Sequence, residues 1–150
     1  MLRSIVAVSA LALAVAIPSG AAPGAPQDPA PASEGGVLLE HMKGLKKNLK
    51  GVAMSLQKSD SKQVLHHIAE MQRLVLLAKL EAPANLEEKP EDERESHSTE
   101  FRKDMIGLLQ ELAGMEIEVL DGELEKAFGR VTGSLYRLRE AAHEKYQSSK

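Results

Sequence analysis

Apolar residues recur at alternating spacings of four and three along four stretches of this chain. Such spacing places them on one stripe of an α-helix, so it predicts four amphipathic helices and no strands. The first two stripes are Leu38, Met42, Leu45, Leu49, Val52 and Leu56, then Val64, Ile68, Met71, Val75, Ala78 and Ala82. The other two are Phe101, Met105, Leu108, Leu112, Met115 and Val119, then Leu124, Phe128, Val131, Leu135, Leu138 and Ala142.

Turn signals separate these stretches. They are a Ser59-Asp60-Ser61 cluster, an acidic, Pro-containing loop at about 82–96, and an Asp121-Gly122 pair. We expect the third helix to begin near His97, with His97 as a solvated residue at its start. Four stripes of similar length bury each other best as an all-α, up-down-up-down antiparallel four-helix bundle, which we assign to residues 37–150.

The chain begins with the features of a secretory signal peptide. Arg3 precedes an unbroken apolar run, Ile5 to Ile17, and small residues follow it. The run is shorter than the about 20 residues that span a bilayer, so we expect cleavage after residue 22 and no stable membrane insertion. Residues 23–36 are rich in Pro, Ala and Gly and are predicted to be a flexible linker. We therefore expect a periplasmic, monomeric protein.

Composition excludes several classes of function. The chain has no Cys, which excludes disulfides, thiolate metal sites, a thiol nucleophile and covalently attached c-type haem. Its net charge of −3 and 3% aromatic residues give no reason to expect a nucleic-acid partner. No metalloprotease, serine-hydrolase or phosphate-loop motif is present, so we do not expect an enzyme.

Glycines inside the predicted helices are unusually frequent. Each costs roughly 0.5–1 kcal/mol relative to Ala. They occupy either exposed positions or points where helices approach closely. The six are Gly44, Gly51, Gly107, Gly114, Gly129 and Gly133.

Met42 and His143 are the main candidates for chemistry. In the predicted bundle, the start of the first helix and the end of the fourth lie together, so these two side chains can face one pocket. Its walls would include Phe101 at the same depth, with Met105 and Met71 deeper, and Val75 and Ala78. A thioether opposite an imidazole suits the axial positions of haem iron.

Two other interpretations stay open on the residues alone. Thioether and imidazole ligands also suit copper, so His41, Met42 and His143 could form a periplasmic copper- or other metal-binding module. Alternatively, Met42 is a core residue and His143 a surface residue of a haem-free structural or stress-related bundle.

Three segments resemble the cytochrome b562 family of periplasmic four-helix-bundle haem proteins. They are LLEHMKGL at 38–45, EFR at 100–102 and REAAHEKY at 139–146, within a resemblance that covers about residues 37–147. The resemblance implies one non-covalent haem b per chain, with Met42 and His143 as its axial ligands. Arg139, Phe101 and Met71 also match family positions. Met105 is a departure, because the family has a second Phe there against the haem.

The resemblance also implies a function. With both axial positions filled by protein, outer-sphere electron transfer is expected and catalysis is not. Arg139, one turn before His143, would pair with a haem propionate. The other partner would be a periplasmic redox protein that binds transiently.

Overall fold

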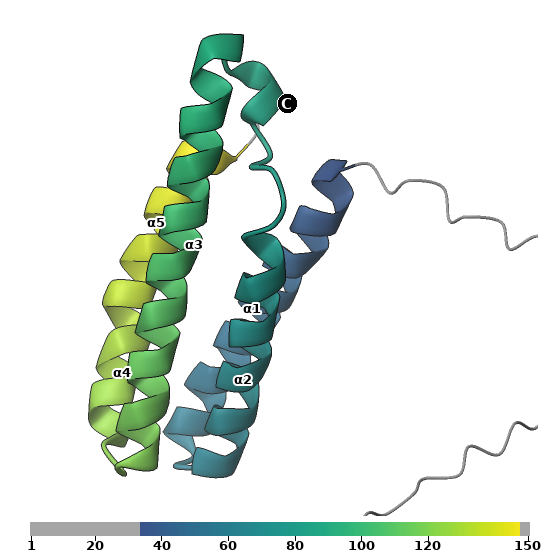
Figure 1. Ribbon diagram of the computed structural model, residues 1–150. Coiled ribbons are helices and arrows are strands. Elements are labelled where there is room, and N and C mark those ends of the chain that lie inside the picture. Colours follow the sequence, from purple (N-terminus) through teal and green to yellow (C-terminus); the bar gives the residue numbers. More distant parts are fainter. Residues whose placement is uncertain (1–33, 148–150) are drawn as a thin grey trace, which may run out of the picture.

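A computed structural model describes residues 34–147, so the predicted signal peptide and most of the predicted linker lie outside the described residues. This part of the chain is helical and contains no strand (Figure 1). Its elements are α1 (Glu34–Gln57), α2 (Ser61–Ala78), the short 3-10 helix η1 (Leu86–Glu88), α3 (Glu91–Leu120), α4 (Leu124–Thr132) and α5 (Ser134–Tyr146).

The helices form the predicted up-down-up-down bundle. Helix α1 packs on α2, α2 on α3, α3 on α4, and α4 returns to α1, with α4 and α5 as two halves of the fourth rod. In Figure 1 the start of α1 and the end of α5 lie at the same end of the bundle. Helices α1 and α5 are not among the helix pairs of residues 34–147 that pack extensively. We call the boundary between them the α1–α5 seam.

The core follows the predicted stripes closely. The largest side chains with almost no exposure are Ile68, Leu112, Met115, Val52, Val64 and Val75. Two stripe residues behave differently from the prediction. Ala82 is exposed because α2 ends one turn earlier, at Ala78, and Phe128 is 40% exposed while its neighbour Ala127 is buried.

Helices α1 and α3 both begin before the positions that the stripes predict. Helix α1 starts at Glu34, inside the last residues of the predicted linker, and α3 starts at Glu91 instead of near His97. Pro90 occupies the N-cap of α3, and three acidic residues fill its first turn, where negative charge is favourable. His97 is therefore inside the helix and buried, not solvated as expected.

The fourth predicted helix is interrupted at Gly133. Its backbone lies at φ −108° and ψ −93°, outside the helical region, and ends α4. Charged contacts hold both sides of the break against α3. The Arg130 guanidinium donates to Glu118 at 2.9 Å and to Glu111 at 2.8 Å, and the Ser134 hydroxyl donates to Glu111 at 2.7 Å.

Gly51 marks a close approach between α1 and α2. A Cβ at this position would lie 2.5 Å from Nε2 of the His67 ring, which covers the glycine. The same ring is fixed through Nδ1 by a 2.9 Å hydrogen bond with the Asn48 side-chain oxygen. By contrast, a Cβ at Gly107 would meet nothing within 4 Å. Some helix glycines, such as Gly51, therefore mark close approaches between helices, and others, such as Gly107, occupy open positions.

Candidate functional site

Met42 lies in the third turn of α1. Its side chain is half-buried and packs against the core, beside the buried stripe neighbours Leu38 and Leu45. The heptad spacing turns all three inward, which explains why a thioether is held at the edge of the apolar interior. Met42 is thus a partly buried residue at the edge of the core.

His143 lies in the last turn of α5, on the other side of the seam, and is exposed. Its backbone carbonyl accepts a 3.1 Å hydrogen bond from the Gln147 amide, which closes the helix end. The start of α1 and the end of α5 lie at the same end of the bundle, and these two helices do not pack extensively. The pairing of Met42 with His143 across the seam stays a prediction.

The end of α5 is anchored by Tyr146, three residues after His143. The Tyr146 side chain is only 5% exposed, and its ring meets the edge of Phe101 at 5.0 Å between centroids. Its hydroxyl donates a hydrogen bond to the Asp104 carboxylate of α3. Burial, together with the Asp104 hydrogen bond, raises the pKa of Tyr146 to about 12, so it stays a neutral donor.

A second set of contacts ties the loop before α3 to the same helix end. The His97 ring lies 5.2 Å from the Tyr146 ring, and its Nε2 makes a 2.8 Å hydrogen bond with Asn85 Oδ1. Asn85 Nδ2 in turn donates to the Lys145 carbonyl at 2.9 Å. Desolvation, and then the charge of Lys89, lowers the pKa of His97, so the folded state favours its neutral form.

We call this set the α5 clasp: Asn85, His97, Phe101, Asp104 and Tyr146. Of its members, the sequence pattern predicts only Phe101 as a site residue. Its polar contacts join residues 12, 42 and 60 positions apart, which no helical period can indicate. The clasp holds the last turn of α5, and with it His143, against α3.

The other predicted wall residues belong to the interior. Phe101, Met105 and Met71 are 2%, 4% and 3% exposed, as their stripe positions predict. Phe101 has the clearest local role, because it contacts Tyr146. Met105 and Met71 are members of the same continuous core as Val75 and Ala78.

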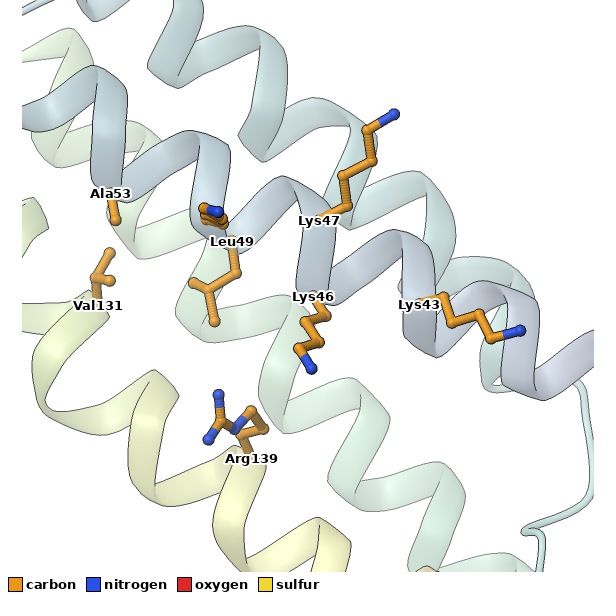
Figure 2. Close-up of a pocket in the computed structure, with 8 residues that line it drawn as sticks. Lys43, Lys46, Lys47, Leu49, Ala53, Val131 and Arg139 are labelled. Carbon is orange, nitrogen blue, oxygen red and sulfur yellow. The ribbon is translucent and has the colours of Figure 1, made fainter.

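A groove of about 470 Å³ lies deeper along the bundle, between α1 and the α4–α5 rod (Figure 2). Its apolar lining consists of Leu49, Ala53 and Val131, and its basic lining consists of Lys43, Lys46, Lys47, Lys50 and Arg139. Neither Met42 nor His143 lines it. Its lining begins at Lys43, the residue after Met42, and at Arg139, one turn before His143, and continues along α1 to Ala53.

Arg139 lies one turn before His143 and lines this groove. Figure 2 shows its side chain on α5 and the Lys46 side chain on α1 both extending into the space between the two helices. Arg139 also forms a 2.7 Å ion pair with its neighbour Glu140, and its guanidinium lies 5.2 Å from the centre of the Tyr136 ring. The ion pair between Arg139 and Glu140 is exposed and therefore weak, so the Arg139 guanidinium can bind another anion in place of Glu140.

Two further features are absent from residues 34–147. No group of three or more His, Cys, Asp or Glu residues is arranged to hold a metal ion in this part of the chain. In the same range, no helix is long and apolar enough to cross a membrane.

Comparison with known proteins gave one match. A model of the family described as cytochrome b562 matches residues 37–147, which is most of the chain and includes every helix that the structure describes except the first turn of α1. A search of curated proteins found no match.

Proposed function

We propose that this chain, which belongs to the cytochrome b562 family, binds one non-covalent haem b at the α1–α5 seam through Met42 and His143. Family membership indicates a haem-binding electron carrier, and the family is not an enzymatic one. The identity of the ligands, the stoichiometry and the periplasmic location are parts of the proposal.

The observation that supports the proposal is that Met42 and His143 lie on two helices that meet at one end of the bundle and do not pack extensively. A half-buried thioether on α1 and an exposed imidazole on α5 lie at one end of the bundle, on helices that make few contacts with each other. The buried Phe101 and the groove residues Leu49 and Val131 supply apolar surface nearby. These donors and this lining fit a haem.

Each residue has a distinct task in this arrangement. When bound, haem supplies a reversible one-electron couple, whose potential a thioether ligand raises. Met42 would offer sulfur from the apolar side, and the α5 clasp would hold the helical turn that carries His143. The Arg139 cation would neutralise a propionate carboxylate at the groove. Phe101, Met105 and Met71 exclude water from the bundle side.

The cellular setting of the proposal comes from the N-terminal sequence. A signal peptide at residues 1–22 would deliver the chain to the periplasm, where it would act as a monomer. Since Met42 and His143 would occupy both axial positions, electrons would pass at the exposed edge of the site to a transiently bound redox protein. Haem binding would also stabilise the folded state by mass action.

A haem titration of the purified chain tests the ligands. We expect saturation at one haem and a low-spin, six-coordinate absorption spectrum in both oxidation states. Met42→Ala and His143→Ala should each convert the spectrum toward high spin. Matched controls are Met54→Ala, which removes an exposed thioether from the same helix, and His66→Ala, which removes an exposed imidazole from α2.

The outcome separates the three interpretations. A spectrum that both site variants leave unchanged would refute the assigned ligands. No saturable haem binding, together with copper retained after dialysis in a Met42- and His143-dependent way, would favour the copper module instead. No binding of either would favour a structural bundle.

A further inference from the structure

Helix α1 carries a cluster of positive charge that is unusual for this chain. Lys43, Lys46, Lys47 and Lys50 follow one another at spacings that place them on one side of the helix, and all four are exposed. Arg139 faces them from α5 across the groove. The whole chain has a net charge of −3, so the cluster is not a consequence of a generally basic composition. We call these five residues the basic patch.

Most of this charge is not neutralised within the protein. Lys43 pairs with Glu40 at 2.8 Å, and Arg139 pairs with Glu140 at 2.7 Å. Within residues 34–147, no ion pair or hydrogen bond involves the ammonium groups of Lys46, Lys47 or Lys50. Other lysines of the chain do have partners.

Lys145 shows the contrast, since its ammonium lies 3.1 Å from both Glu100 and Asp104. Like charges one turn apart destabilise a helix, so the stability of α1 does not explain the lysine cluster. A cluster of this kind is better explained by an anionic surface that it meets outside the protein.

The patch has the layout of a protein-docking surface. Its charges border one side of an apolar surface formed by Leu49, Ala53 and Val131, and polar residues at the edge of apolar surface are typical of protein interfaces. It begins at the residue after Met42 and reaches Arg139, one turn from His143 (Figure 2). A partner seated here would therefore cover the groove next to the proposed haem ligands.

We propose that the basic patch docks the acidic face of the protein that exchanges electrons with this chain. The link to electron exchange rests on the proposed function, whereas the docking itself does not. Unpaired lysines steer an oppositely charged partner from a distance and set its orientation. The complex with the partner nevertheless stays short-lived, because exposed charges are screened and bind weakly.

The test measures binding of an acidic protein probe, oxidised plant-type ferredoxin, to the isotope-labelled chain by NMR at low ionic strength. Amide shifts should cluster on α1 from residue 43 to 53 and on α5. The patch variant Lys46→Gln/Lys50→Gln should weaken binding about five-fold or more, and about 0.3 M salt should abolish it. The control Lys58→Gln/Lys62→Gln removes the same charge from exposed lysines at the opposite end of the bundle and should change affinity less than about two-fold.

Three results would overturn the proposal: no binding at low salt, equal losses in both variants, or shifts that map away from the groove. Patch-dependent binding to phosphatidylglycerol vesicles with none to ferredoxin would also overturn it, in favour of a membrane surface. Because the NMR measurement needs no haem, it distinguishes failure of this proposal from failure of haem binding. If haem binds, stopped-flow oxidation of the ferrous protein by hexacyanoferrate(III) should be slowed by the patch variant more than by the control.

Discussion

Removing the Tyr146 ring should loosen the helix end that carries His143. The side chain is 5% exposed and packs on Phe101 and His97. Truncating a buried aromatic residue to Ala costs about 3–5 kcal/mol in protein cores, and the position near the chain end favours the lower value. Tyr146→Phe keeps the ring and loses only the hydrogen bond to Asp104. That carboxylate is 45% exposed and returns to water, so we expect a loss of about 1 kcal/mol.

The difference between the two variants measures what ring packing contributes. We expect Tyr146→Ala to be about 2 kcal/mol less stable than Tyr146→Phe, which corresponds to a urea midpoint about 1 M lower at ordinary m-values. Helix content by circular dichroism during urea unfolding of the haem-free chain gives both numbers. Tyr136→Ala is the matched control, because Tyr136 is 51% exposed on the same helix and should cost under about 1 kcal/mol.

The Tyr146→Ala and Tyr146→Phe variants also test whether the clasp positions His143 for haem binding. Haem affinity should fall more in Tyr146→Ala than in Tyr146→Phe, because His143 lies three residues from the lost anchor. Equal stability of the Ala and Phe variants would refute the assignment of the ring as the anchor of α5. Lower stability with unchanged haem affinity would refute the positioning of His143 by the clasp.

Two further predictions concern buried contacts. The pKa of His97 is lowered from 6.5 in the folded chain, so the unfolded chain binds more protons below about pH 7. The stability that neutral His97 contributes is therefore fully present above that pH and is lost as pH falls through its lowered folded-state pKa. Denaturation at several pH values should show a smaller pH dependence of stability in His97→Gln, and an unchanged dependence would contradict this prediction. Gly51→Ala should destabilise the bundle, since its Cβ would lie 2.5 Å from the His67 ring, whereas Gly107→Ala, which meets nothing, should stabilise it by about 0.5–1 kcal/mol. Thermal unfolding of the two variants compares them, and the same sign for both would rule out the close-approach explanation.

The bundle could be predicted because its information is local. Alternating spacings place residues such as Val52, Ile68 and Leu112 on one stripe, and all three are fully buried. Short turns then require antiparallel neighbours, which places the start of α1 and the end of α5 together. The stripe pattern does not indicate where a polar segment becomes helical. For that reason the first turns of α3, which are mostly charged, escaped prediction, and His97 was assigned to solvent.

The break at Gly133 could not be predicted for a related reason. Six glycines lie inside the predicted helices, and the residues around them do not distinguish Gly133, which ends a helix, from the other five. The difference is tertiary: Arg130 and Ser134, on either side of the break, both bind Glu111 of α3. At the site, the stripe predicted the burial of Met105 and Met71. The predicted helix order brought Met42 and His143 together as candidates, and the family resemblance then favoured haem over the other interpretations. The clasp depends on contacts between distant segments and was not foreseen.

Iron-edge X-ray absorption of the haem-loaded chain tests the central claim most directly, since it reports the atoms bound to iron. We expect one sulfur ligand and five nitrogen ligands in the ferrous protein, with the sulfur lost in Met42→Ala and retained in Met54→Ala. Six light-atom ligands in the unmodified chain, or a sulfur signal that survives Met42→Ala, would contradict it.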